Sequence, residues 1–360
     1  MTTSEVAPDL AASMRLSHPR LPRWAPVLVA VLAVAAAGLP AMLLGWSVVG
    51  WLALALVLFL VALPGWSMAV ENNRAALDRL MTTLIWAAFG IAVIPLLWLI
   101  WTVVSKGASV INMEFLTYSM RNVVGEGGGI YHALIGTLLV TAAAAAISIP
   151  VGIFAAIYLV EYGKGTVLGR WITFLVDVMT GIPSIVAGLF ALSLFVLLFG
   201  PEVRMGFGGS VALSLLMIPI VVRSAEEMLR LVPGDLREAS YALGVPKWRT
   251  ITRVVLPTAM GGIITGVTLA IARVIGETAP LLVIAGKTDS VNANLFNERM
   301  STLPVYIYYS FTQPGITPPG ATEAPGIARA WGAALVLIVI VMVLNLLARV
   351  IGKFFAPKKG

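Results

Sequence analysis

The sequence predicts an all-α integral membrane protein, and its composition and the distribution of its apolar residues carry that prediction. Of the 360 residues, 59% are hydrophobic and 11% are charged, and the mean hydropathy is +0.96. The apolar residues form long blocks rather than the periodic stripes of water-soluble helices. A helix needs about 20 mostly apolar residues to cross a hydrocarbon core roughly 30 Å thick. The sequence contains eight such candidate spans.

The first two spans, joined around Gly45, are expected to form a tight helical hairpin. A cleaved signal peptide is the alternative for the first span, but its apolar run is too long and a second span follows almost at once. The sixth span is short and interrupted by Pro219. In order, the predicted spans are approximately Trp24–Leu44, Trp46–Leu63, Leu84–Val104, Ala133–Val160, Trp171–Phe199, Ser210–Val222, Gly261–Ala285 and Ala328–Ile351.

The charge distribution indicates topology. The formal net charge is +7, but the basic residues gather in short loops, as the positive-inside rule requires of cytoplasmic loops, so nucleic-acid binding is disfavoured. Both termini are expected on the cytoplasmic side, which agrees with an even number of spans. The absence of cysteine excludes disulfides and thiolate metal sites, and no metal site is expected.

The chain is expected to divide into two parts. Residues 1–82 comprise a polar tail, the extra transmembrane hairpin and a linker, and residues 83–360 form a core of six spans. Within the core, the Gly-rich and Pro-rich stretches 105–130 and 313–326 are predicted outer loops that could contact another protein.

A polar, basic segment at about residues 224–258 separates the sixth and seventh spans. Asp235 and Glu238 have the spacing of a capping box for a helix through Leu243. Gly244 suits the left-handed position that ends a helix, and a second short helix follows from Lys247. The segment is therefore predicted to be a two-helix projection on the cytoplasmic face. The alternative is an ordinary basic loop lying on lipid headgroups.

This segment resembles the EAA motif of ABC importer permeases. The family pattern is Glu-Ala-Ala, three residues, Gly, nine residues, Ile, one residue, Leu-Pro, and the spacing here matches throughout. Ser240 and Val254 replace the family's Ala and Ile. The resemblance implies a coupling helix that inserts into a groove of a separate ATP-hydrolysing subunit. The matching residues are Glu238, Ala239, Ser240, Gly244, Val254, Leu256 and Pro257.

The seventh span carries two ionisable residues, Arg273 and Glu277, at a spacing that places both on one helix face. An ionisable group near the bilayer centre costs about 2.5 to 3.5 kcal/mol, so both should face protein or a polar cavity. They could neutralise each other and fix helix packing. Alternatively, Arg273 lines a translocation path for an oxyanion, since guanidinium suits phosphate oxygens. Arg223, at the inner end of the sixth span, is either a headgroup anchor or a third pathway residue.

Three runs, GIPSIVAGLF, RSAEEMLRLVP and ARVIGETAPLL, resemble the PstA family, the permeases of phosphate-specific ABC importers. The resemblance extends from about Leu84 to the C-terminus. It implies a type I ABC importer permease fold with six core helices in a bacterial inner membrane, and Arg223, Arg273 and Glu277 as phosphate-pathway residues. The N-terminal hairpin departs from the usual six-span pattern.

The resemblance also implies partners: a homologous permease subunit, two ATPase subunits and an extracytoplasmic phosphate-binding protein. No cofactor is expected on this chain, and ATP and Mg²⁺ would be bound by the ATPase. The sequence GKT at residues 286–288 imitates the end of a phosphate-binding loop, but position 281 is Leu and not Gly. No catalytic residue is therefore assigned.

The sequence leaves alternative functions open. The substrate could be phosphonate, sulfate or molybdate, and a passive anion channel would work without an ATPase. A membrane enzyme acting on a lipid phosphate would need a nucleophile or an acid–base set that the sequence does not provide. Asp177, near Gly181 and Pro183 in the fifth span, either lines a cavity or satisfies a donor freed where Pro183 interrupts the helix.

Overall fold

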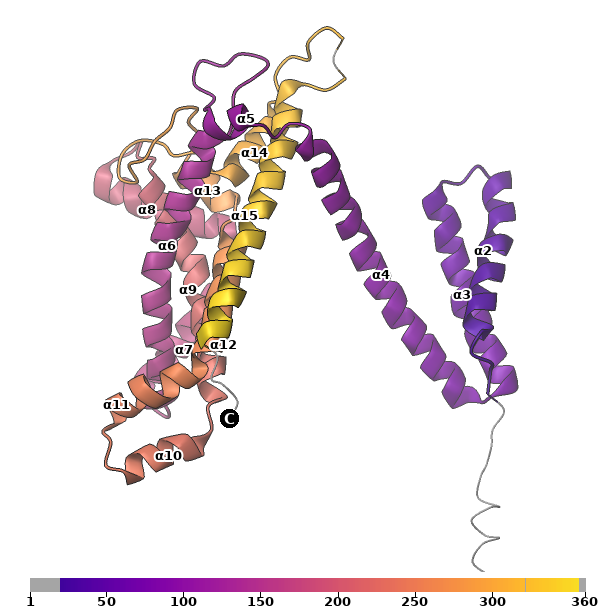
Figure 1. Ribbon diagram of the computed structural model, residues 1–360, viewed down its shortest axis with the longest axis horizontal. Coiled ribbons are helices and arrows are strands. Elements are labelled where there is room, and N and C mark those ends of the chain that lie inside the picture. Colours follow the sequence, from indigo (N-terminus) through magenta and orange to yellow (C-terminus); the bar gives the residue numbers. More distant parts are fainter. Residues whose placement is uncertain (1–19, 321, 356–360) are drawn as a thin grey trace, which may run out of the picture. The chain divides into compact units, whose positions relative to one another are not determined.

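The computed structural model describes residues 20–320 and 322–355, and within these ranges every regular element is a helix (Figure 1). The prediction of an all-α membrane fold is confirmed. The chain separates into two compact units, residues 1–100 and 101–360. The predicted boundary after residue 82 and the observed boundary after residue 100 both separate the first hairpin from the core. The observed boundary, however, lies within a helix, α4 (Asn73–Ala108).

The N-terminal unit is built on the predicted hairpin of α2 (Ala25–Leu43) and α3 (Val48–Val70). Gly45 turns the chain with a φ of +65°, and the Trp51 indole donates to the Val34 carbonyl across the hairpin at 2.9 Å. The buried face of α2 repeats small residues every four positions, which lets two helices approach closely. After a short turn, α4 begins at Asn73 and continues to Ala108. The buried positions of α2 are Ala25, Val29, Ala33, Ala37 and Ala41.

The core unit contains the remaining helices and two π-helical turns, η1 and η2. They are α5 (Met113–Thr117), α6 (Tyr131–Ile157), η1 (Tyr158–Tyr162), α7 (Val167–Thr180), α8 (Ser184–Phe199), α9 (Gly206–Arg230), α10 (Gly234–Ala242), α11 (Lys247–Thr250), η2 (Ile251–Val255), α12 (Leu256–Val274), α13 (Ala279–Ile284), α14 (Leu303–Thr312) and α15 (Pro325–Phe355). Within this unit, α10 and α11 lie at one end and α5 at the other (Figure 1). We call these the coupling end and the opposite end.

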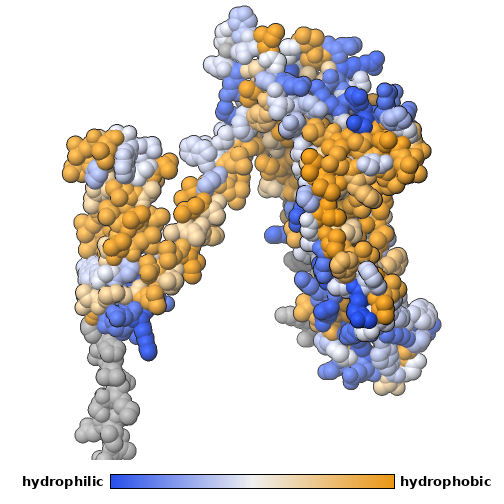
Figure 2. All heavy atoms as spheres, turned by 180° about the vertical axis from the view of Figure 1, so that it is seen from behind, coloured by the Kyte–Doolittle hydropathy of each residue, from blue (hydrophilic) through white to orange (hydrophobic). Residues whose placement is uncertain are grey.

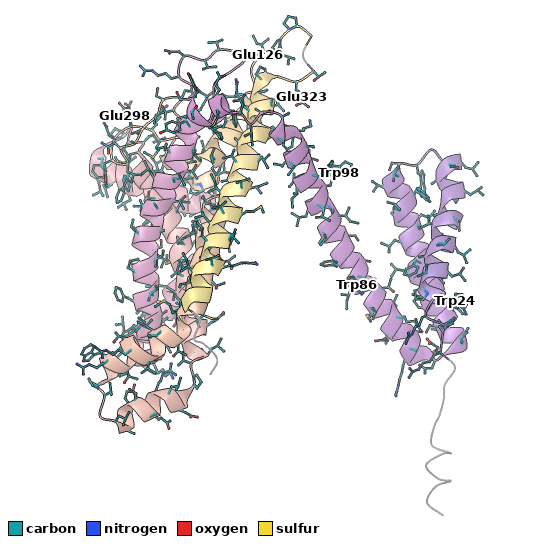
Figure 3. The ribbon with its side chains drawn as sticks, viewed as in Figure 1. Trp24, Trp86, Trp98, Glu126, Glu298 and Glu323 are labelled. Atoms are coloured by element: carbon teal, nitrogen blue, oxygen red, sulfur yellow. The ribbon has the colours of Figure 1, made fainter. Side chains whose placement is uncertain are left out.

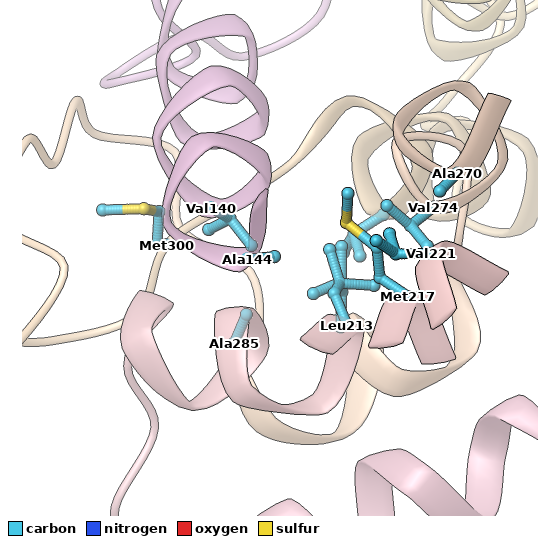
Figure 4. Packing of buried hydrophobic residues seen from close by; sticks show 11 residues of the cluster. Val140, Ala144, Leu213, Met217, Val221, Ala270, Val274, Ala285 and Met300 are labelled. Carbon is cyan, nitrogen blue, oxygen red and sulfur yellow. The ribbon is translucent and has the colours of Figure 1, made fainter. Parts of the chain in front are cut away.

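Helix α9 is the centre of the core and contacts α6, α7, α8, α12 and α13. Its side chains Leu213, Met217 and Val221 are fully buried against Val140 and Ala144 of α6 and against the end of α12 (Figure 4). Close packing of this kind fixes the positions of the helices that carry the polar residues.

Three predicted spans differ from the structure. The fifth span was predicted as one helix. It is formed by two helices, α7 and α8, and the helix axis bends by 110° between them, around Gly181–Pro183. Proline has no amide hydrogen and moves the preceding residue away from helical geometry. The seventh ends at Val274, and α13 is a separate short helix. The sixth is longer than predicted, because α9 passes Pro219 and continues to Arg230.

Seven of the described helices are long and apolar enough to cross a membrane, or eight if the bent α7–α8 pair forms one span. Helix α15 ends on the coupling side of the core unit (Figure 1). The predicted cytoplasmic N-terminus concerns residues that lie outside the described part of the chain.

Candidate functional site

The motif residues form a two-helix projection, α10 to η2, which we call the coupling hairpin (residues 234–255). Gly244 has a φ of +74°, as predicted. The Gly244 amide donates to the Tyr241 carbonyl at 2.9 Å and the Val245 amide donates to the Ser240 carbonyl at 3.2 Å. These two bonds are the Schellman motif that ends α10 and turns the chain toward α11.

The predicted capping box is wrong. Helix α10 begins at Gly234 with Pro233 as its cap, and no side chain bonds to the first-turn amides. The fixed φ of proline starts this helix instead. Asp235 still lies in the first turn, where a carboxylate interacts favourably with the helix dipole. Glu238 and Ala239 are exposed.

The coupling hairpin is anchored to the coupling end of α6 through Glu161. Arg237 donates to the Glu161 carboxylate from Nε at 3.0 Å and from Nη2 at 2.9 Å, and also to the carbonyls of Val232 and Leu229. Lys247 donates to the Glu161 backbone carbonyl and lies over the Tyr162 ring. These bonds join the hairpin directly to η1, which continues from α6.

The two arms of the hairpin are joined by a buried hydrogen bond. Ser240, in place of the family's alanine, lies 2.8 Å from the Thr250 hydroxyl. Beyond Thr250, helix α11 continues through η2 into α12, so Val254, Leu256 and Pro257 connect the hairpin to the core without a break. An exposed apolar surface remains on the hairpin, formed by Leu236, Tyr241, Leu243 and Trp248. Such a surface suits a protein partner.

Arg223 lies in a charged cluster on α7 and α9. Its guanidinium pairs with Asp177 of α7 and donates to Glu226 at 2.8 Å. Arg230 donates to the other oxygen of Glu226 at 2.5 Å. The Glu226 side chain is buried and that of Asp177 is 60% exposed. Asp177 thus bonds to a side chain of another helix, and not to a donor freed where Pro183 interrupts its own helix.

Arg273 and Glu277 do not form the mutually neutralising pair that was one of the two alternatives for them. Helix α12 ends at Val274, so Glu277 lies in the break before α13 and the helical spacing no longer applies. Among the described residues neither side chain makes an ion pair or hydrogen bond. Arg273 is exposed in the isolated chain and Glu277 is half-buried.

Glu161, Asp177 and Glu226 are the functional-site residues whose partners sequence reasoning did not identify. The Glu226 contacts follow from the i, i+3 and i, i+4 positions of Arg223 and Arg230 on one helix, which sequence spacing could have indicated. The bonds of Glu161 and Asp177 join segments 76 and 46 residues apart, and no local pattern indicates them.

A bundle of apolar helices with a polar two-helix projection anchored at one end defines a multi-pass membrane permease. The family described as "Binding-protein-dependent transport system inner membrane component" matches residues 148–360. The chain belongs to this family, and its relatives there include proteins named PstA.

Three comparisons illustrate the similarity. "Phosphate transport system permease protein PstA 1" of Mycobacterium tuberculosis (strain CDC 1551 / Oshkosh) is 48% identical over 290 residues, which cover 80% of this chain and 92% of the relative. The PstA of Yersinia pestis is 38% identical over 289 residues, covering 80% and 92%. A solved inward-facing structure of the MetNI methionine ABC transporter has a TM-score of 0.48, with 19% identity, over 64% of this chain and 95% of that one.

Proposed function

We propose that this chain is one permease subunit of an ATP-driven inorganic phosphate importer and forms half of the translocation path. The observation that carries the proposal is the similarity, at 36 to 48% identity over about four-fifths of the chain, to permeases named for phosphate transport. The anchored coupling hairpin supports the ATP-driven part, because its exposed apolar surface would be unfavourable in water without a partner.

The proposed assembly contains a homologous permease subunit, two ATPase subunits and an extracytoplasmic phosphate-binding protein. ATP and Mg²⁺ would be bound by the ATPase subunits. Closure of those subunits would move the coupling hairpin, and the bonds of Arg237 and Lys247 to Glu161 would carry this movement to α6. Access to the path would then alternate between the two sides of the membrane.

The proposed pathway residues differ in whether a side chain of opposite charge already pairs with them. Arg273 makes no ion pair within the described part of the chain, so its guanidinium can offer its donors to phosphate oxygens. Arg223 is held by two carboxylates, and an anion could use its charge only by displacing Asp177. Glu277 would repel the anion and keep it from being trapped. Arg273 is therefore the residue most sensitive to substitution in this proposal.

Uptake of radiolabelled phosphate tests the proposal in cells that lack this chain and other phosphate systems. Re-expression should restore uptake at low external phosphate. Arg273→Gln should abolish it and Arg273→Lys should retain part, because the charge remains while the planar fork is lost. Arg349→Gln, which removes an exposed charge from α15, is the matched control. Unchanged uptake in both Arg273 variants would remove this residue from the path.

Another oxyanion is the alternative substrate, because the coupling hairpin would be the same for any of them. Restored cells that take up no more phosphate than deleted cells would favour phosphonate, sulfate or molybdate. Uptake of each labelled anion would then identify the substrate, while the permease role would stand.

A further inference from the structure

The N-terminal unit contains a cavity of about 1340 Å³ where α2, α3 and the start of α4 meet. One end of its lining is basic and carries Arg20, Arg74 and Arg79. The other end is apolar and includes Phe59, Leu63 and Trp86. All of these residues belong to one compact unit. The cavity is larger than the roughly 300 to 1,000 Å³ of most small-molecule sites.

The basic end of the cavity carries a net positive charge. Arg79 is neutralised by Glu71, to which it donates at 2.9 and 2.8 Å, and Glu71 also accepts from Ser67 at 2.6 Å and from the Leu21 amide at 2.7 Å. Arg20 and Arg74 are exposed and make no ion pair among the described residues. Asp78 is the other carboxylate in the lining, so the three arginines and two carboxylates of the lining together leave one net positive charge.

The backbone adds to this preference for an anion. Asn72 caps the start of α4 by accepting from the Ala75 amide at 2.8 Å, and Arg74 lies in that first turn. The N-terminal turn of a long helix carries a partial positive charge. An anion near Arg74 would therefore meet both the guanidinium and the helix dipole.

The apolar end and the surrounding surface suit hydrocarbon. Trp24 and Trp66, whose ring centroids are 6.3 Å apart, lie at the same end of the hairpin as the basic residues. Tryptophan at such a position marks the membrane–water interface. The window of α4 that could span a membrane is only 6% buried, and Trp86 itself is 67% exposed. Figure 2 shows hydrophilic residues at the α3–α4 end of this unit beside a largely hydrophobic surface, and Figure 3 labels Trp24 and Trp86.

We propose that this cavity binds an anionic phospholipid, with its phosphate between Arg20 and Arg74 and its acyl chains along Phe59, Leu63 and Trp86. Free phosphate would use only the basic end, whereas the cavity continues into an apolar end that only an amphiphile fills. A zwitterionic lipid would gain less, because its own cation would meet the net positive charge of the lining. The proposal does not depend on the transported substrate.

Fluorescence quenching by brominated lipids tests this proposal on the full chain purified in a neutral detergent. The probes are phosphatidylglycerol and phosphatidylcholine with the same brominated acyl chains, titrated into the wild type and variants. Phosphatidylglycerol should give a saturable component that phosphatidylcholine lacks, and Trp86→Phe should remove it. Each arginine near an anionic lipid contributes about a fivefold change in affinity, so Arg20→Gln with Arg74→Gln should weaken binding about thirtyfold.

Matched variants distinguish the effect of charges in the cavity lining from the effect of charges elsewhere on the protein. Arg20→Lys with Arg74→Lys should keep most of the affinity, and Arg23→Gln with Lys164→Gln, exposed residues outside the cavity lining, should change it less than twofold. Equal quenching by the two lipids, or equal loss in the control and in the Gln pair, would overturn the proposal. Displacement of phosphatidylglycerol by inorganic phosphate would assign the cavity to the free anion instead. Binding that occurs only after deletion of residues 2–19 would identify that segment as the occupant.

Discussion

Glu161 is the residue on which the attachment of the coupling hairpin depends. Its side chain is 6% exposed, and its carboxylate accepts two bonds from Arg237 while its backbone carbonyl accepts one from Lys247. A carboxylate withdrawn from water is favourable only while it has a cation and hydrogen-bond donors. The ion pair between Glu161 and Arg237 therefore attaches α10 to η1.

Arg237→Gln should destabilise the protein strongly. It leaves the Glu161 carboxylate buried without its cation, which costs about 3 kcal/mol. Thermal unfolding of the purified chain in detergent measures this loss. Arg249→Gln is the control, since Arg249 is exposed and, among the described residues, its guanidinium interacts only with the neighbouring Trp248 ring. Surface changes usually stay within about 0.5 kcal/mol.

A double variant checks the cause. Adding Glu161→Gln to Arg237→Gln removes the unpaired charge and should recover part of the lost stability. If the double variant is as unstable as the sum of the two single variants, the pair does not explain the loss.

At the residue scale, Ser240 makes a hydrogen bond that the motif pattern does not predict. Its small size is compatible with the alanine of the family pattern, but its hydroxyl also bonds to Thr250 in the buried joint between the two arms. The motif spacing identified the position, whereas the bond depends on Thr250 approaching from the far side of the Gly244 turn. Only the folded hairpin brings the two hydroxyls together.

At the scale of one element, the end of α10 depends on the left-handed conformation of Gly244. A side chain added there would meet no atom within 4 Å, so a substitution tests backbone conformation alone. A left-handed conformation costs an L-residue about 1 to 2 kcal/mol, and asparagine tolerates it better than β-branched residues do.

Gly244→Asn should therefore keep most phosphate uptake, and Gly244→Val should lose most of it at equal protein levels. Uptake would be measured in the same restored cells as above, with immunoblots of the membrane fraction as the control for expression. Equal activity of the Asn and Val variants would show that this turn does not determine coupling.

The turn between α3 and α4 predicts a pH dependence of stability. The Arg79 guanidinium and the Ser67 hydroxyl lower the pKa of Glu71 from its ordinary 4.5 to about 2. Since the folded pKa is the lower one, the stabilisation is complete above pH 4.5 and is lost as the pH falls toward 2. Glu71→Gln should lower the melting temperature at pH 7, and the difference from wild type should shrink toward pH 3.

Glu126→Gln is the control for this measurement. Glu126 lies in the exposed loop before α6, makes no ion pair in the described chain, and is labelled with Glu298 and Glu323 in Figure 3. Its substitution should leave the melting temperature the same at both pH values. A pH-independent effect of Glu71→Gln would mean that Glu71 acts through packing and not through its charge.

The helices themselves were largely predictable because a membrane span requires a long apolar segment wherever it occurs. Their interruptions were predicted only in part. Pro183, expected to interrupt a helix, lies in the 110° bend between α7 and α8, but Pro219, also expected to interrupt one, lies inside the continuous helix α9, as Pro95 and Pro150 lie inside α4 and α6. Whether proline ends a helix depends on what neighbouring helices supply to the freed carbonyls. The break that contains Glu277 precedes Pro280 in the first turn of α13, and it removed the helical spacing on which a pair of Arg273 with Glu277 would depend.

At the scale of the whole molecule, close helix crossings rely on glycines whose Cβ positions are already occupied. A Cβ on Gly188 of α8 would lie 2.6 Å from the Pro280 Cα of α13, and one on Gly136 of α6 would lie 2.0 Å from the Ser301 carbonyl oxygen. Sequence spacing gives no sign of these contacts, because each glycine meets a segment far along the chain.

Segment 300–303, which lies against Gly136, is held by hydrogen bonds to residues of other segments. The Ser301 hydroxyl accepts from the Thr288 amide at 2.7 Å and donates to the Thr288 carbonyl at 2.5 Å. The Leu303 amide donates to the Thr137 hydroxyl at 2.7 Å, and the Met300 amide donates to the Ala285 carbonyl at 3.1 Å. An added methyl group at Gly136 must therefore displace backbone that segment 285–288 and Thr137 of α6 hold by hydrogen bonds.

Gly136→Ala should lower the melting temperature of the purified chain, because overpacking of a fixed core costs about 1 to 3 kcal/mol or more. Gly90→Ala in α4 is the matched control, since a Cβ there meets nothing within 4 Å and alanine favours a helix by up to about 1 kcal/mol. The two substitutions add the same methyl group to a long helix, so opposite shifts would assign the effect to the α6 crossing. Equal shifts, or a Gly136→Ala variant that is stable and monodisperse, would show that the core accommodates a methyl group at position 136.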